Sequence, residues 1–160
     1  MDIDVWLPTP SPLATPDYLA AVAREAEERG VATLWVGEHV VFFDGYASSY
    51  PYAADGKMPL PGDTGLLEPL STLSFLAGVT TRLRLGTAML LLPQRNPVYT
   101  AKETSTLDWL SGGRLDLGVG VGWLREEFDA LQAPWPERGA RTDEYLQVLH
   151  SLWCDDRPAF

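Results

Sequence analysis

Short apolar runs alternate with segments of helical period along the chain. The apolar runs predict four strands, at residues 3–7, 33–40, 83–92 and 114–123. Helical segments follow them at residues 15–30, 68–79, 97–110, 124–131 and 140–153. Strands that alternate with helices indicate an α/β fold with a parallel sheet covered by helices. Four such βα units fit either an open doubly wound sheet or half of a (β/α)₈ barrel, which needs roughly 250 residues when complete.

The helix boundaries carry local start and stop signals. Thr15 and Asn96 are capping side chains that each precede a proline in the first helical turn. Gly30 and Gly112 stand where two helices should end. A long connection, residues 41–67, is rich in Gly, Pro, Asp and aromatic residues. Because long loops inside a domain usually have a function, we expect this one to lie on the active-site side.

The composition narrows the class of protein. With 160 residues, 46% hydrophobic and 21% charged, the chain is expected to form a single domain over residues 1–160. The net charge of −10 argues against a nucleic-acid or anionic-membrane surface, since both require clustered Lys and Arg. No apolar stretch approaches the ~20 residues of a membrane span. The single cysteine, Cys154, and an acidic N-terminus without a signal peptide predict a cytoplasmic protein.

The stretch GRLDLGVGVGW, residues 113–123, resembles a phosphate-binding glycine loop at first sight. The G-x-G-x-x-G spacing fails in every register. With the two-residue period of a strand, Gly118, Gly120 and Gly122 instead share one face. These glycines either leave a void at the carboxyl-terminal rim, where parallel α/β folds bind ligands, or relieve crowding between curved strands. The second and third apolar runs also contain small residues near their carboxyl-terminal ends. In the third run, the two-residue period predicts that Gly86, Ala88 and Leu90 share one face.

A few side chains could carry chemistry. His39 follows Glu38 at the end of the second run, where it could move a proton near neutral pH or merely cap the loop. The aromatic residues of the 41–67 loop either cover a pocket or form a small satellite core. Glu126 and Glu127 are explained by the electrostatics of a helix N-terminus, without a catalytic role. Two distant histidines without a cysteine partner make no zinc motif, so we expect no metal.

Several segments resemble the bacterial luciferase-like family. They are WVGEHV (35–40), the continuous stretch 83–131 and ERGARTDEYL (137–146). The loop SYPYAADGKMPLPGDTGLLEPL (49–70) is similar to the branch of that family that uses the deazaflavin coenzyme F-420. The family is a TIM barrel with a flavin or deazaflavin at its carboxyl-terminal face. The resemblance therefore implies that this chain is the first four βα units, the N-terminal half of such a barrel.

The resemblance also implies site residues. A non-prolyl cis peptide at Ala88-Met89 would support the cofactor ring, and His39 would be the catalytic residue, orienting the substrate or transferring a proton. Gly122 and Trp123 match positions beside the cofactor. Some dehydrogenase members carry a carboxylate in place of Trp123, which argues against sugar-phosphate dehydrogenation. The expected cofactor-binding set is completed by Glu38, Thr87 and Gly120.

The implied function is F-420-dependent hydride transfer to or from a small organic substrate. FMN-dependent monooxygenation is the alternative within the family. A third alternative is a truncated, inactive half-barrel that acts only as a binding or self-associating module. In a four-stranded sheet the runs 3–7 and 114–123 are open edges, which invite pairing with another chain. We therefore expect homo-oligomers formed through exposed sheet edges.

Overall fold

The computed structural model describes residues 2–159 and contains four strands with helices between them. The strands are β1 (Val5–Trp6), β2 (Thr33–Val36), β3 (Arg84–Leu91) and β4 (Leu115–Gly120). The helices are α1 (Pro16–Glu28), α2 (Pro69–Val79), the 3₁₀ turn η1 (Leu92–Gln94), α3 (Pro97–Ser111), α4 (Arg125–Ala130) and α5 (Arg138–Cys154). This order of elements confirms the predicted α/β fold.

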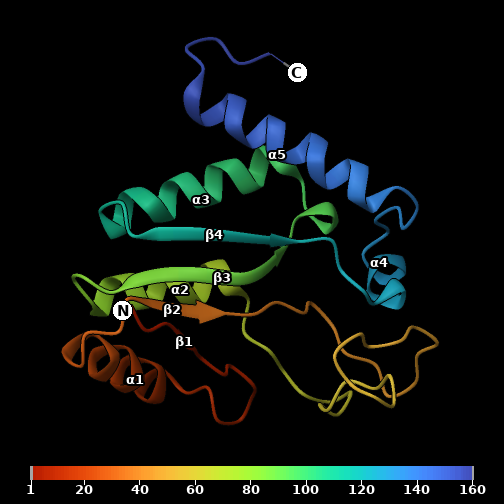
Figure 1. The fold of residues 1–160 in the computed structure, drawn as a ribbon, viewed down its shortest axis with the longest axis horizontal. Coiled ribbons are helices and arrows are strands. Elements are labelled where there is room, and N and C mark those ends of the chain that lie inside the picture. Colours follow the sequence, from red (N-terminus) through yellow and green to blue (C-terminus); the bar gives the residue numbers. More distant parts are fainter. Residues whose placement is uncertain (1, 160) are drawn as a thin grey trace.

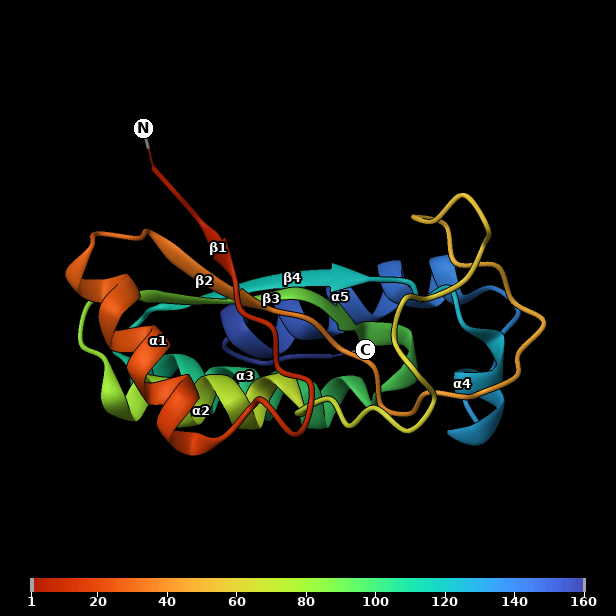
Figure 2. The ribbon, with the colours of Figure 1, turned by 90° about the horizontal axis from the view of Figure 1, so that it is seen from below.

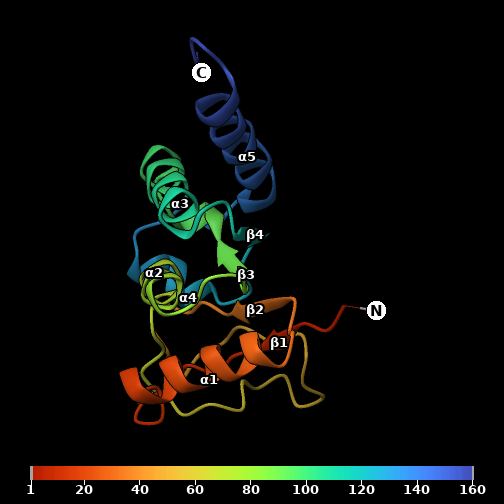
Figure 3. The same ribbon diagram turned by 90° about the vertical axis from the view of Figure 1, so that its left-hand side faces the viewer.

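The sheet has the strand order β1-β2-β3-β4, and every neighbouring pair is parallel. In Figure 1 the strands run in one direction, and α4 and the long loop lie beyond their carboxyl ends. Helices α1, α2 and α3 lie on one face of the sheet (Figure 2). Helix α5 lies beyond β4 and packs beside α3 (Figure 3). All carboxyl-terminal strand ends therefore meet at one edge, where the predicted site residues lie.

The main core fills the space between the sheet and these helices. Alternate strand residues point into it, because the side-chain period of a strand is two. Arg114 is buried at the opposite edge, where its guanidinium donates to the carbonyl oxygens of Ala77, Thr80 and Leu83. It thereby ties the turn between α2 and β3 to the start of β4. Fully buried leucines of this core include Leu34, Leu73, Leu76, Leu85 and Leu90.

The local helix signals are confirmed. The Thr15 hydroxyl accepts a hydrogen bond from the Tyr18 amide at 3.2 Å. The side-chain oxygen of Asn96 accepts from the amides of Val98 and Tyr99 at 3.0 and 3.1 Å. Gly112 ends α3 in the left-handed region, with φ of 74°. These contacts satisfy amides and carbonyls that helix ends leave unpaired, so short-range sequence determines where the helices begin and end.

The strand boundaries and one strand face differ from prediction. The first strand has two residues instead of five, and β2 ends at Val36 instead of residue 40. The pairing of β3 with β4 shifts register between Thr87 and Leu90. An extra residue in one strand reverses the alternation beyond it. Leu90 therefore lies in the helix-covered core. The prediction that it shares a face with Gly86 is wrong.

Candidate functional site

The glycines of β3 and β4 make room for neighbouring protein groups. A Cβ added to Gly86 would lie 2.3 Å from the Trp35 ring. A Cβ added to Gly118 would lie 2.3 Å from the Thr87 carbonyl oxygen. Both distances are far below an ordinary contact, so the space is already occupied. Of the two explanations open from the sequence, relief of crowding holds at these positions.

A shelf with few side chains lies at the carboxyl-terminal edge of the sheet. Ala88 and Met89 are joined by a cis peptide bond, as the resemblance implies, and both side chains are exposed. A Cβ on Gly37 would lie 3.4 Å from the Ala88 carbonyl oxygen, and a Cβ on Gly120 would lie 2.9 Å from the Met89 side chain. Glycines thus flank the Ala88-Met89 peptide on both sides, Gly37 just after β2 and Gly120 at the end of β4. We call Gly37, Ala88, Met89 and Gly120 the shelf.

Two further predicted residues hold the backbone around the shelf. The Thr87 hydroxyl is fully buried and donates to the Gly118 carbonyl oxygen at 2.7 Å. Gly122 has φ of 76°, and a Cβ there would lie 2.7 Å from the buried Phe128 ring. Arg138 donates to the Gly122 carbonyl oxygen at 3.2 Å. Gly122 is therefore required by the sharp turn from β4 toward α4, which only a residue without a side chain can make here.

His39 lies just after β2 and is held from both sides of its ring. Its Nδ1 lies 3.3 Å from Oε2 of Glu127, and its Nε2 accepts a hydrogen bond from the indole N–H of Trp123 at 3.3 Å. The Phe42 ring packs on the imidazole, with centroids 4.9 Å apart. The structure thus brings His39 and Trp123 together, two residues that the sequence named separately.

Glu127 is the site residue that the sequence analysis missed. Its side chain is fully buried, and it accepts hydrogen bonds from the amides of Val40 and Val41 at 2.5 and 3.3 Å and from Gln94 Nε2 at 3.0 Å. Burial alone would raise the pKa of Glu127, but the hydrogen bonds from His39, Gln94 and Val40 hold it below its ordinary value. The explanation by helix electrostatics alone is therefore wrong for Glu127.

The same correction applies to Glu126, which anchors the long loop. Its carboxylate accepts from the amides of Ala47 and Ser48 at 2.6 and 3.2 Å and from the Ser48 hydroxyl at 2.7 Å. Burial would raise the pKa of Glu126, but these hydrogen bonds lower it to about 2. The first turn of α4 therefore binds the beginning of the 41–67 loop through two adjacent carboxylates.

Aromatic residues of the loop pack around Trp123. The ring centroids of Tyr46 and Tyr50 lie 5.6 and 5.1 Å from that of Trp123, both in edge-to-face arrangement. Tyr52 packs on Tyr50 at 5.5 Å and is largely exposed. The loop aromatics thus form a small cluster on the His39–Trp123 pair, as expected for the satellite core that was one of the two interpretations of the sequence.

Glu38 faces away from this cluster. It is buried, and its carboxylate accepts from the Leu91 amide at 2.5 Å and forms an ion pair with Arg95. Burial raises the pKa of Glu38, against the lowering effect of Arg95. Arg95 also pairs with Glu68, the N-cap of α2, at 2.7 Å. These bonds hold the end of β3 in place, and no contact in this geometry supports the predicted role of Glu38 in cofactor binding.

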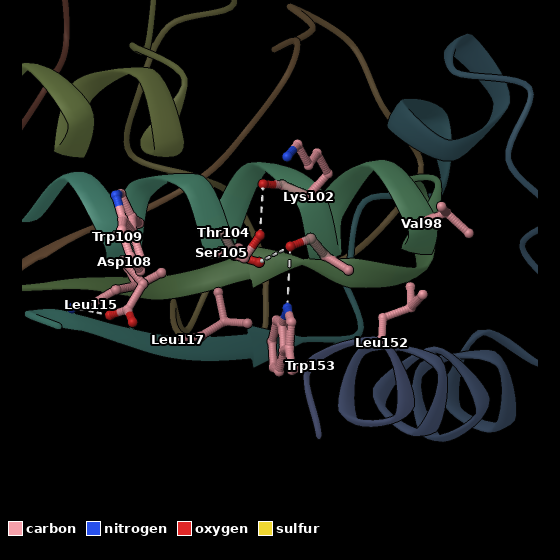
Figure 4. A pocket seen from close by; sticks show the side chains of 11 residues that line it. Val98, Lys102, Thr104, Ser105, Asp108, Trp109, Leu115, Leu117, Leu152 and Trp153 are labelled. Carbon is pink, nitrogen blue, oxygen red and sulfur yellow. Dashed lines mark hydrogen bonds between the residues drawn. The ribbon is translucent and has the colours of Figure 1, made fainter. Parts of the chain in front are cut away.

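A cavity of about 750 Å³ lies away from this edge, between α3, β4 and α5. Figure 4 shows Leu115 and Leu117 of β4 and Trp109 and Trp153 of the helices around it. The Trp153 indole donates to the Ala101 carbonyl oxygen at 3.1 Å. The walls are mostly apolar and bring no reactive side chains to one point. We therefore place the candidate site at His39 and the shelf instead.

Residues 1–160 match the family described as luciferase-like monooxygenase. The chain belongs to this family. The four βα units correspond to about half of the TIM barrel of its luciferase-like relatives. The matches include proteins named for coenzyme F-420 and a structure solved with FMN, so this is a family of flavin- and deazaflavin-dependent oxidoreductases and monooxygenases.

The luciferase-like relatives of this chain include an uncharacterized protein, a dehydrogenase and a monooxygenase. An uncharacterized protein of Mycobacterium tuberculosis is 34% identical over 141 residues, which cover 88% of this chain and 50% of that protein. An F-420-dependent glucose-6-phosphate dehydrogenase of Kineococcus radiotolerans is 32% identical over 91% of this chain and 39% of its own length. The solved monooxygenase RslO1 of Streptomyces bottropensis is 26% identical with a TM-score of 0.75, covering 100% of this chain and 46% of RslO1. The chain spans about half the length of the curated relatives it matches.

No helix within residues 2–159 has both the length and the apolar character needed to cross a membrane. The same range contains no group of three His, Cys, Asp or Glu residues that could hold a metal ion.

Proposed function

We propose that this chain forms the ring-binding half of an F-420-dependent oxidoreductase that transfers a hydride to or from a small organic substrate. The observation that carries the proposal is the shelf at the same sheet edge as His39 and Trp123. The proposed ring would lie against the Ala88-Met89 peptide, whose two side chains are exposed between the buried Gly37 and Gly120. The F-420-dependent dehydrogenase match over 91% of the chain supports the choice of ring.

The residues of the site have separate roles in this proposal. A bound deazaflavin or flavin ring supplies the hydride chemistry, which no protein side chain provides. Ala88, Met89 and Gly120 would support one face of the ring. His39 would accept or return the proton that accompanies the hydride, through its Nε2 once the Trp123 N–H releases it. Trp123 and the loop aromatics would exclude water from one side of the site.

A second candidate function is FMN-dependent monooxygenation. It is supported by the match to the monooxygenase RslO1, which covers the whole chain. The proposed shelf would serve either ring, because glycine and alanine discriminate only by shape. The two candidates therefore share their ring-binding residues and differ in the cofactor that the chain prefers.

The ring-binding proposal is tested by titrating the folded chain with F-420 and with FMN, following cofactor fluorescence. Met89→Glu places a charge on the shelf, at a side chain that is 45% exposed, and should weaken binding by roughly tenfold or more. Val98→Glu is the matched control, since Val98 on α3 is 46% exposed and lines the distant cavity. Preferred binding of FMN would select the second candidate. Absence of binding by the folded protein, or equal binding by Met89→Glu, would refute the proposal.

We also propose that the 160-residue chain, prepared on its own, self-associates through its sheet edges. In the described residues β1 and β4 each have one neighbour, and Val5 and Trp6 of β1 are 37% and 53% exposed. Because all four strands are parallel, a two-fold axis along them would place β4 of one copy beside β1 of another in parallel. Sedimentation velocity over a range of concentrations should show dimers or larger species, and a stable monomer at all concentrations would refute this.

A further inference from the structure

We infer that Glu127 is a positioning residue that fixes the tautomer of His39, with the proton on Nδ1 and the lone pair on Nε2. The inference rests on the donors and acceptors around the two side chains. Glu127 comes from α4 and His39 from the segment after β2, 88 residues apart in sequence. The position of either residue in the sequence does not predict that it contacts the other, so the role of Glu127 is inferred from their contact in the structure.

The carboxylate side of the pair requires a donor at His39 Nδ1. The backbone amides of Val40 and Val41 and the side-chain amide of Gln94 can only donate to Glu127. A carboxyl group surrounded by these donors accepts hydrogen bonds with both oxygens, and its proton would have no acceptor there. Oε2 of Glu127 therefore acts as an acceptor toward His39 Nδ1 as well, which must carry a hydrogen.

The opposite side of the ring favours the same tautomer. The indole N–H of Trp123 is a donor and has no lone pair available. It lies 3.3 Å from His39 Nε2, which accepts this hydrogen bond when it carries the lone pair. A hydrogen on Nε2 would place two N–H groups face to face. The contacts at both ring nitrogens thus agree on one neutral tautomer, and a fixed partner on the second nitrogen is the usual device for orienting a functional histidine.

Glu126 provides a natural comparison within the same helical turn. It also binds amides of the long loop, those of Ala47 and Ser48, with a carboxylate of the same charge. Its bonds go to Ser48 and the backbone, whereas Glu127 contacts His39 directly. A change at Glu126 therefore perturbs the loop and the local charge without altering the partner of the imidazole.

The consequence for catalysis rests on the proposed function. A lone pair at Nε2 makes this nitrogen, and not Nδ1, the atom that would accept a proton from the substrate once the Trp123 N–H releases it. Loss of the carboxylate would leave His39 in place but with its hydrogen on the wrong nitrogen. Glu127 thus acts through His39 and does not itself touch substrate.

The inference is tested by ¹⁵N NMR of the imidazole nitrogens in the chain without any cofactor, at about pH 8, where imidazoles are largely neutral. His150, which is exposed on α5, is the internal reference. In Glu127→Gln the new amide group keeps an oxygen for Val40 and turns its NH₂ toward Gln94 and His39. Gln94 can turn over, since its own side-chain oxygen has no partner, but His39 can accept only by moving its hydrogen to Nε2. The indole N–H of the partly exposed Trp123 then gives up its contact with Nε2.

We expect His39 to carry its hydrogen on Nδ1 in the wild type and in Glu126→Gln, and on Nε2 in Glu127→Gln. The pyrrole-like and pyridine-like ¹⁵N positions of the two ring nitrogens would then exchange. An unchanged tautomer in folded Glu127→Gln would overturn the inference. Because the readout needs no cofactor, it remains valid if the proposed function fails.

A second variant keeps the test decisive if Glu127→Gln does not fold by circular dichroism. Trp123→Phe removes the N–H at Nε2 and keeps an aromatic ring against the loop. If Glu127 fixes the tautomer, His39 keeps its hydrogen on Nδ1 in this variant. A shift to Nε2 would show that Trp123 fixes it instead, and would refute the inference.

Discussion

Gly118 of β4, which lies beside Thr87 of β3, offers a test in which the same change from glycine to alanine has opposite effects at two sites. A Cβ at Gly118 would lie 2.3 Å from the Thr87 carbonyl oxygen, about 1 Å short of an ordinary contact. The obstacle is backbone inside a paired sheet, so it cannot rotate away as a flexible side chain would. Gly118→Ala must therefore push the two strands apart at the point where the shelf begins.

The cost of Gly118→Ala can be worked out from the contacts that move. Overpacking of this kind costs about 1–3 kcal/mol. The Thr87 hydroxyl bond to the Gly118 carbonyl oxygen, now 2.7 Å long, would stretch and lose roughly another 1 kcal/mol. We expect the free energy of unfolding to fall by about 2–4 kcal/mol, which corresponds to a melting temperature lower by about 4–16 °C for a chain of this size.

Gly78→Ala is the matched control for Gly118→Ala. Gly78 lies inside α2 and has no other group within 4 Å of an added Cβ. Alanine should stabilise the helix there by about 0.5–1 kcal/mol. Urea unfolding followed by circular dichroism would measure both variants. If Gly118→Ala is as stable as the wild type, the described approach of Thr87 to Gly118 is wrong.

Two further predictions concern carboxylates outside the site. Glu27 accepts hydrogen bonds from the amides following α2; burial would raise its pKa, but these bonds lower it to about 2. The ionised Glu27 therefore contributes to stability above its ordinary pKa of 4.5, and this contribution is lost as the pH falls toward 2. Glu27→Gln should accordingly melt at a lower temperature than the wild type above pH 4.5, and this difference should disappear between pH 4.5 and pH 2 in thermal melts. Arg95→Met should lower the free energy of unfolding by about 3 kcal/mol because it leaves the Glu38 carboxylate buried without its partner. Adding Glu38→Gln should recover much of that loss in urea unfolding, and a double variant no more stable than Arg95→Met would contradict the pairing.

The missed role of Glu127 shows where the sequence still held a usable signal. Leu124 and Phe128 are four residues apart and both fully buried, so they define the inward face of the first turn of α4. Glu127 lies three residues after Leu124 and shares that face. A carboxylate on a buried face needs donors. The pattern therefore indicated a partnered glutamate, although nothing local identified His39, Gln94 or the Val40 amide as the donors.

The sequence by itself determined the order of strands and helices, the parallel sheet and the helix ends. Each of these depends on interactions within a few residues, such as Asn96 capping α3, or on a short apolar period repeated four times. The resemblance also located Ala88-Met89, His39 and Trp123 at one end of the strands.

Only the tertiary structure decided which side chains meet. The second strand ends at Val36 because Glu38 and His39 leave the sheet to bind Arg95 and Glu127, 57 and 88 residues away. The space beside Gly86 is occupied by the Trp35 ring, and the space beside Gly118 by the Thr87 carbonyl oxygen. No local sequence pattern specifies these neighbours. Such contacts depend on how β2, β3 and β4 stack side by side, and the donors and acceptors they bring together are far apart in the chain. The inferred tautomer of His39 is set at that level, by its contact with Glu127 of α4.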